Sequence, residues 1–382
     1  MDTLHFDKAE MFFEKLLAED PGDQFGYNNL GCIYKYTARY DKALVCFRKA
    51  MLYMDDEPNT YPYGNMGHTY ERMGEYAEAA LTYLALVERF PDRKNSSIRD
   101  IVTCLSRSGE HERAVEYLNS HKHKDFSEMR RAYLGALICL DMGDKVRAGE
   151  YLQKFRELLG TDDGSTVNHV RYLEQHVQYL LLYGDYRYAV QQMQKHCKTL
   201  IKLAKEDKMS FLEVGQDYAD VLFYLTMYHD ACGAQVIEDA KKTGMLQSIK
   251  SAFGKKDTQE INAGTVAAFG IQLSAALDKV IAEHHNDQED VFLYHHKELW
   301  WMRFMVSYWK RDGKLEEIFA EMEKCDICRG CSENICLQMY AAKALLLEHK
   351  GEKAKAREAY AKIGEMDPYE IYGRTKLRFW KE

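Results

Sequence analysis

A small residue that recurs about every 35 positions constrains the fold of this chain more than any other feature. Six alanines form the series: Ala9, Ala43, Ala79, Ala114, Ala148 and Ala189. Successive members are 34 to 36 residues apart, except for the last pair, which is 41 apart. A fixed period in this range indicates stacked copies of one supersecondary unit. The chain therefore favours an elongated repeat array over several separate globular domains.

Residues at fixed offsets from each alanine define the unit. Large apolar residues follow four and seven positions later, as in Tyr83 and Leu86, and these offsets lie on one face of a helix. A glycine stands five residues before most of the alanines, as at Gly74, Gly109, Gly143 and Gly184, where a preceding helix is expected to end. Each unit is therefore predicted to be a helical hairpin whose second helix begins near the alanine.

Two stretches carry a resemblance to a known family. They are Asn29-Leu30-Gly31-x-x-Tyr34 with Ala43-x-x-x-Phe47, and Asn65-Met66-Gly67-x-x-Tyr70 with Ala79-x-x-x-Tyr83. The glycine in each is expected where the two helices of a hairpin press together. These motifs resemble the tetratricopeptide repeat (TPR) family. The resemblance implies an all-α protein, a right-handed α-solenoid of stacked antiparallel helical hairpins whose first helices line a concave surface.

The resemblance varies along the chain and suggests three regions. Regular TPR-like repeats, beginning with a half-repeat, are expected over residues 1–200, and irregular helical repeats over residues 201–310. Residues 311–382 are expected to form TPR-like hairpins with a four-cysteine loop and a terminal capping helix, because the pattern returns at Gly351, Ala356, Tyr360 and Pro368.

Composition excludes several classes of protein. A net charge of −8 argues against a nucleic-acid-binding protein, which needs an excess of Lys and Arg. No apolar run approaches the roughly 18 residues needed to span a membrane, and the first residues lack the basic and apolar pattern of a secretory signal. Six cysteines are scattered through helical sequence, which is typical of a reducing compartment. A cytoplasmic protein is therefore expected.

Asparagines on the predicted first helices are the first candidates for ligand contact. Asn29 and Asn65 each stand two residues before the helix glycine. In some members of the resembled family, asparagines at this offset form a ladder that hydrogen-bonds the backbone of an extended peptide. A carboxamide supplies both a donor and an acceptor. Asp100 and Leu134 occupy the next two equivalent positions, so the ladder is expected to have two rungs at most.

Basic and aromatic residues accompany the asparagines. Near the ends of successive first helices are Lys35, Arg72 and Arg107, and Tyr36, Tyr61 and His68 are close by in the pattern. Together they suit an acidic or C-terminal carboxylate group of a protein or peptide partner. The alternative is that the asparagines belong to the scaffold and the basic residues are only solvated.

Four cysteines gather in one predicted loop: Cys325, Cys328, Cys331 and Cys336. Four thiolates suit tetrahedral Zn²⁺, and Gly330 permits a tight reversal of the chain between them. A [4Fe–4S] cluster is the alternative, because the Cys-x-x-Cys-x-x-Cys opening is shared with ferredoxins, although the next spacing is not. Unmetallated thiols or labile disulfides are the third possibility.

The first helix has no predicted partner before it. Residues 1–19 match a second helix, and Met11 points away from the stripe of Ala9, Phe13 and Leu16. Repeats bury their apolar faces only against neighbours. The exposed face predicts either fraying or self-association through this half-repeat.

No constellation typical of an enzyme is present, and the function expected is a non-catalytic scaffold or adaptor that binds a protein or peptide, with a structural metal in the C-terminal loop. A redox- or metal-sensing regulator is one alternative. An accessory subunit that delivers substrate to a modifying enzyme is another.

Overall fold

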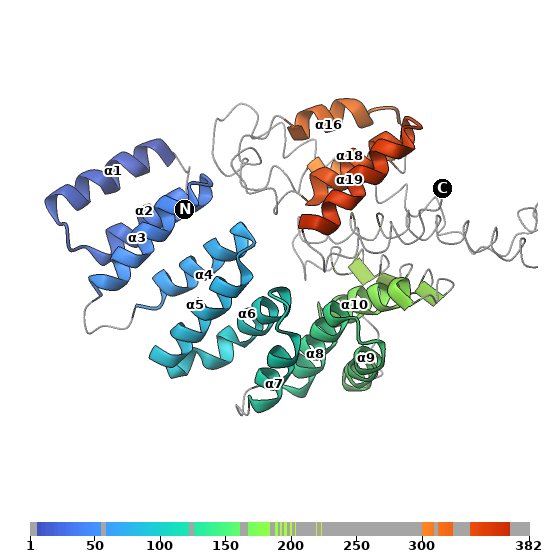
Figure 1. Cartoon of the computed structure of the whole chain (residues 1–382), viewed down its shortest axis with the longest axis horizontal. Coiled ribbons are helices and arrows are strands. Elements are labelled where there is room, and N and C mark those ends of the chain that lie inside the picture. Colours follow the sequence, from blue (N-terminus) through green and yellow to red (C-terminus); the bar gives the residue numbers. More distant parts are fainter. Residues whose placement is uncertain are drawn as a thin grey trace, which may run out of the picture. The chain divides into compact units, whose positions relative to one another are not determined.

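The computed structural model describes residues 6–54, 59–121, 126–160, 167–183, 300–308, 312–323 and 337–366, with isolated positions between 188 and 223. Every regular element in these ranges is a helix (Figure 1). The chain divides into two compact units, and the described residues up to 158 belong to the first.

The first unit repeats one pattern of two helices. After α1 (Phe6–Glu19), the first helices of the hairpins are α2 (Gln24–Tyr36), α4 (Tyr61–Met73), α6 (Lys94–Arg107) and α8 (Glu128–Met142). Their second helices are α3 (Tyr40–Leu52), α5 (Tyr76–Arg89), α7 (His111–Ser120) and α9 (Lys145–Leu159), and a 3-10 turn (Pro91–Arg93) precedes α6. Each second helix begins three residues before the repeating alanine, so the predicted hairpins are confirmed.

The hairpins stack in chain order. Each helix from α1 to α7 packs on the next one, and first helices also contact one another, α2 with α4 and α6 with α8. Figure 1 shows α2, α4 and α6 along one side of the array and α3, α5 and α7 along the other. The predicted all-α solenoid of hairpins is confirmed for these residues.

The repeating small residue lies where the hairpins are tightest. Ala43, Ala79, Ala114 and Ala148 are fully buried. The aromatic residue four positions after the first two of them, Phe47 and Tyr83, is buried as well. Burying one such side chain stabilises the fold by about 1.5–3 kcal/mol.

The helix glycines receive these aromatic rings. A Cβ added at Gly31 would lie 2.6 Å from Cε1 of Phe47, and one added at Gly67 would lie 2.5 Å from Cε1 of Tyr83. Real Cβ atoms do not approach carbon so closely, so only glycine permits this contact. Gly135 on α8 receives the ring of Tyr151 in the same way. The expected close packing at Gly31 and Gly67 is confirmed.

The turn inside each hairpin is a Schellman motif. After α4, the amide of Gly74 donates to the Glu71 carbonyl and the amide of Glu75 to the Tyr70 carbonyl. The same pair of bonds closes the turns at Gly109, Gly143 and Gly351, and all four glycines have φ between 76° and 88°. After α2 the pair is present too, but Ala38 occupies the glycine position with φ of 56°. An alanine in this left-handed region is strained by about 1–2 kcal/mol.

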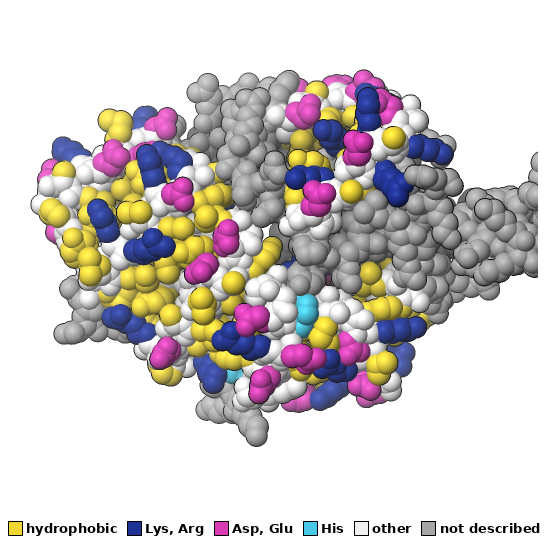
Figure 2. All heavy atoms as spheres, viewed as in Figure 1, with side chains coloured by type: hydrophobic (Ala, Val, Ile, Leu, Met, Phe, Trp, Pro, Cys, Tyr) yellow, Lys and Arg dark blue, Asp and Glu magenta, His cyan; other side chains and the backbone are white. Residues whose placement is uncertain are grey.

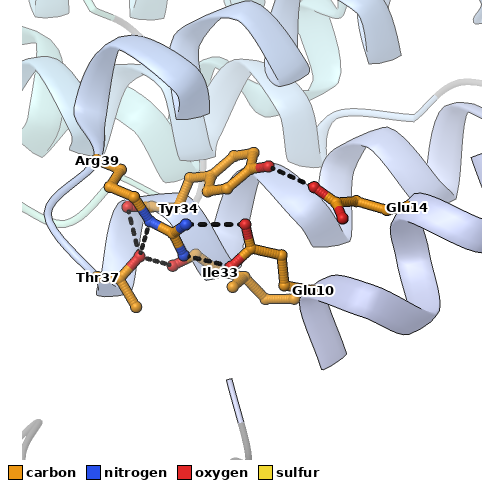
Figure 3. Close-up of polar contacts among 6 residues, drawn as sticks. All are labelled: Glu10, Glu14, Ile33, Tyr34, Thr37 and Arg39. Atoms are coloured by element: carbon orange, nitrogen blue, oxygen red, sulfur yellow. Dashed lines mark hydrogen bonds and ion pairs between the residues drawn. The ribbon is translucent and has the colours of Figure 1, made fainter. Parts of the chain in front are cut away.

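Polar contacts attach α1 to the same turn. The Arg39 guanidinium donates to both carboxylate oxygens of Glu10 at 2.8 and 2.6 Å, and the Tyr34 hydroxyl donates to Glu14 at 3.3 Å (Figure 3). The outer face of α1 remains open, since Met11 is 70% exposed and Phe12 62%. Arg39 therefore holds α1 on α2. Self-association through the open face of α1 stays a prediction.

The described part of the second unit contains one further hairpin. After α10 (Val167–Tyr183), α16 (Leu315–Glu323) packs on α18 (Leu337–His349), and α18 packs on α19 (Lys353–Met366). The α18–α19 turn carries Gly351, as expected. The proposed capping helix after Pro368, and nearly all of the irregular region 201–310, lie outside the described residues.

We expect Gly67→Ala to lower the free energy of unfolding by about 1–3 kcal/mol, because the new methyl group displaces the buried ring of Tyr83. Gly64→Ala in the same helix is the matched control. A Cβ there meets nothing within 4 Å, so this change should be neutral or stabilise the protein by up to about 1 kcal/mol. Urea unfolding followed by circular dichroism measures both. Equal effects of the two changes would contradict the ring-on-glycine contact.

We expect Ala38→Gly to raise the free energy of unfolding by about 0.5–1 kcal/mol, because glycine relieves the left-handed strain and loses part of the gain to unfolded-state entropy. The reverse change at the equivalent position, Gly74→Ala, should be destabilising. Thermal unfolding of the two variants measures both effects. A destabilised Ala38→Gly protein would contradict the strain assigned to Ala38.

Candidate functional site

Two neighbouring first helices each present a stripe of side chains to solvent. The exposed or half-buried residues of α2 fall at Phe25, Asn28, Asn29, Cys32 and Tyr36. Those of α4 include Tyr61, Asn65, His68 and Arg72. Offsets of three, four, seven and eleven residues lie on one side of a helix. Because α2 packs on α4, we name these two stripes together, with Lys35 at their junction, the α2–α4 face.

A chain of hydrogen bonds crosses this face. The amide nitrogen of Asn65 donates to Oδ1 of Asn28 at 3.0 Å, and Oδ1 of Asn65 accepts from Nζ of Lys35 at 3.0 Å. One carboxamide thus joins α4 to two positions of α2. Asn29, the residue expected to match Asn65, is exposed and makes none of these bonds. Its neighbour Asn28 forms the hydrogen bond with Asn65 instead.

Lys35 is unusual on this face because its charge is buried. The residue is 6% exposed, and its Nζ lies 5.0 Å from the centre of the Tyr36 ring. No carboxylate of the described residues lies within ion-pair distance of it. Burial lowers the pKa of Lys35, the thiol of Cys32 partly opposes this, and Arg72 lowers the pKa further. The alternative that this lysine is only solvated is therefore wrong.

His68 stands at the edge of a second polar network. Its Nδ1 lies 3.0 Å from the Tyr83 hydroxyl, which donates to Oε1 of Glu71 at 2.7 Å. The thiol of Cys104 also reaches Glu71, at 3.5 Å. Burial raises the pKa of Glu71, but the hydrogen bonds from His68 and Tyr83 outweigh it and hold the pKa below its usual value. This network fixes the ring that fills the space at Gly67.

Arg107 differs from Lys35 in its surroundings. Its Nε lies 3.5 Å from Oδ2 of Asp141 on α8, and the same oxygen accepts from the Ser106 hydroxyl at 2.9 Å. Arg107 therefore belongs to a polar contact between α6 and α8, and its charge is balanced. Asp100, which replaces asparagine at the next equivalent position, has a pKa raised by burial and by the charge of Glu71.

Two exposed aromatic residues mark the opposite end of the face. Phe25 is 55% exposed and Tyr61 is 72% exposed. The buried amide of Asn59 donates to Oε1 of Gln24 at 3.1 Å and so holds the N-terminal ends of α2 and α4 together. Figure 2 shows hydrophobic side chains spread among charged ones over the part of the surface formed by α1 to α5.

The predicted residues are thus only partly brought together. Lys35 contacts both Asn65 and Tyr36. His68 and Arg72 lie along the α4 stripe, with Tyr61 at its N-terminal end, and Arg107 lies on α6. Asn28 and Phe25 were not among the residues predicted from the sequence. Phe25 precedes Gly31 by six residues, as Tyr61 precedes Gly67, so the repeat offset was sufficient to identify it.

The predicted metal site, Cys325, Cys328, Cys331 and Cys336, lies outside the described residues. Within the described ranges, no group of three or more His, Cys, Asp or Glu side chains is arranged to hold a metal. Burial raises the pKa of the Cys46 and Cys139 thiols to about 11, in keeping with inert structural cysteines. No helix in the described ranges has the length and apolar character of a membrane span.

Comparison with solved structures finds similar helical chains. The C-terminal part of a TPR repeat-containing protein from Cytophaga hutchinsonii is 15% identical, with a TM-score of 0.37, over 56% of this chain and 90% of that one. A chain of Naa15/Naa10 bound to HypK-THB is 15% identical, with a TM-score of 0.33, over 97% of this chain and 57% of that one. The TPR domain of P58(IPK) is 14% identical, with a TM-score of 0.22, over 98% of this chain and 96% of that one.

None of the curated proteins is significantly similar to this chain in sequence. A family model for the tetratricopeptide repeat, however, matches residues 26–53 and 61–93. These ranges cover α2 with α3 and α4 with α5, the two hairpins that form the α2–α4 face. These two hairpins of the chain are therefore recognised as tetratricopeptide repeats.

Proposed function

We propose that this chain is a non-catalytic scaffold or adaptor that binds a segment of another protein on the α2–α4 face. The observation that carries the proposal is the Asn28–Asn65–Lys35 hydrogen-bond chain, which joins two helices through half-buried asparagines and is flanked by exposed aromatic rings. It combines polar groups that fix a partner with apolar area that supplies affinity. We further propose a cytoplasmic location, as expected from the scattered reduced cysteines.

The chemistry of the face suits a protein partner. Aromatic residues are enriched at interfaces because a rigid ring buries a large area at small entropic cost. Asn28 and Asn65 retain acceptor and donor capacity beyond the bond that joins them, which a peptide backbone can use. The helices beneath are fixed by the buried rings of Phe47 and Tyr83, so the face is formed before the partner arrives.

A catalytic role is not supported by the polar clusters. Ser106 lies 3.2 Å from Nδ1 of His111 and 2.9 Å from Asp141, a set of residue types that hydrolases use. Ser106 is fully buried, however, so no substrate reaches its hydroxyl. Burial also raises the pKa of the Tyr83 hydroxyl far above its usual value. Both clusters therefore serve packing in this proposal.

The four-cysteine loop carries a second part of the proposal, a structural zinc site that braces the C-terminal hairpins. The helices that flank the loop, α16 and α18, pack on one another, and Nζ of Lys350 lies 3.0 Å from Oε1 of Glu316. That ion pair joins the ends of α16 and α18 that are remote from the loop, so the two helices are antiparallel. Such a pair suits a connecting loop that places four ligands on one ion. An iron–sulfur cluster in this loop would instead favour the sensor function, and delivery of substrate to a modifying enzyme remains an alternative role for the α2–α4 face.

We expect peptides selected from a random display library against the full chain to slow amide exchange in α2 and α4. Tyr61→Ser should lower their affinity by about tenfold or more, because exposed aromatic anchors dominate such interfaces. Leu81→Ser, which removes an exposed apolar side chain from the second helix α5, is the matched control and should have no effect. Protection confined to other helices, or a loss of affinity caused equally by Leu81→Ser, would overturn the proposed surface.

We expect the protein purified without oxygen to contain one zinc per chain and to be colourless. Binding of four thiolates in small zinc peptides releases on the order of 10 kcal/mol, so Cys328→Ser should remove the metal and speed amide exchange in α16, α18 and α19. Exchange in α2 to α9 should not change. Metal analysis and an absorption spectrum check this. Iron with sulfide would establish the alternative cluster, and absence of any metal would refute both.

A further inference from the structure

The open face of α1 is a surface that the later repeats bury. Ala9 occupies the position of the repeating alanine and is half-buried, whereas Ala43 and Ala79 are fully buried. Phe12 is 62% exposed, although Cys46 at the same position of the next repeat is only 7% exposed. The helix α1 thus presents to solvent the side that α3 and α5 pack against the first helix of their own hairpins.

Two cation–aromatic contacts accompany the ring-on-glycine contact in the α2–α3 hairpin. The Lys42 ammonium lies 5.3 Å from the centre of the Tyr34 ring, and the Lys49 ammonium lies 4.9 Å from the centre of the Tyr27 ring. A cation over the face of a ring is attracted by the negative charge of that face. Together with the ring on the helix glycine, these contacts define how a first helix binds a second helix in this array.

The residues of α3 that make these contacts recur on α1. Lys8, Phe13 and Lys15 stand 34 residues before Lys42, Phe47 and Lys49. Both lysines of α1 are exposed, and Phe13 is half-buried.

The polar contacts of α1 with α2 use different residues, Glu10 and Glu14, which face Arg39 and Tyr34 (Figure 3). The helix α1 therefore carries two sets of contact residues. One set holds it on α2, and the other matches the set with which α3 binds a first helix.

We propose that α1 binds a helix of a partner protein that carries an aromatic residue, a glycine four positions later and a tyrosine three positions after the glycine. The glycine receives the Phe13 ring. The first aromatic ring lies under the ammonium of Lys15, and the tyrosine lies under that of Lys8. Phe12 becomes buried against the same helix, which continues the row of first helices beyond α2.

The pattern also indicates why the partner is a different protein. Within the described ranges it occurs twice, in α2 at Tyr27, Gly31 and Tyr34, and in α4 at Tyr63, Gly67 and Tyr70. Both helices are already packed on their own second helices, α3 and α5. A folded second copy cannot offer either of them without opening a hairpin. This surface lies outside the α2–α4 face, so the inference does not rest on the proposed function.

The test uses a fluorescein-labelled peptide with the sequence of α2 (Gln24–Tyr36), with Cys32→Ser to prevent oxidation and alanine-rich flanks that favour a helix. We expect the full chain to bind it, as measured by fluorescence anisotropy, and amide exchange to slow in α1. Gly31→Leu in the peptide should weaken binding about tenfold or more, because the leucine occupies the space of the Phe13 ring. Leucine favours a helix more than glycine does, so loss of helix cannot explain weaker binding.

Two exposed neighbours on α1 provide matched variants of the protein. Phe12→Ser removes a ring from the proposed contact and should lower the affinity for the peptide about tenfold or more. Met11→Ser should have little effect, because Met11 matches Val45 and Leu81, which stay exposed in complete hairpins. Circular dichroism checks that both variants are folded.

Three results would overturn the inference. The first is absence of binding, or equal affinity for the peptides with glycine and with leucine. The second is an equal loss of affinity with Phe12→Ser and Met11→Ser, which would place the contact elsewhere. The third is a dimer of the full chain, seen by light scattering, that dissociates with Phe12→Ser, because a second copy would then cover this face as predicted for self-association. None of these results bears on the α2–α4 face.

Discussion

The contact between a helix glycine and a buried aromatic ring underlies the rest of the structure. Gly31 with Phe47 and Gly67 with Tyr83 let the two helices of a hairpin approach until the ring fills the space of a missing side chain. Protein interiors are packed so closely that a single added methyl group is felt there. This contact sets the spacing within the hairpins, and with it the separation of the side chains on the α2–α4 face.

Much of the fold follows from the repeated residues. The alanine series and the glycines five residues before it predicted the hairpins α2–α3 to α8–α9 with their turns, and α18–α19 as well. The turn after α2 was harder to predict, because Ala38 replaces the glycine there. The structure shows that the same two hydrogen bonds form around alanine and that local strain is tolerated. The turn geometry therefore persists where the residue that favours it is absent.

The site was less predictable than the fold, for a physical reason. A repeat offset identifies which residues share a stripe, and it placed Asn65, His68 and Tyr61 correctly on α4. It does not tell which of two consecutive asparagines, Asn28 or Asn29, turns toward the neighbouring helix. It also gives no measure of burial for a long side chain, so Lys35 seemed as likely to be solvated as Arg107. Stacking of α2 on α4 decides both points, and the repeat pattern contains no information about them.

The proposed function requires a partner protein to occupy the α2–α4 face. Site-specific photo-crosslinking tests this most directly, with a benzophenone side chain placed at His68 on the face or at Val45, an exposed position on α3. We expect one discrete protein to be crosslinked in cells from position 68 and not from position 45, and Lys35→Met to reduce the yield. Crosslinking of the same protein from position 45 alone, or an unchanged yield with Lys35→Met, would contradict the proposed function.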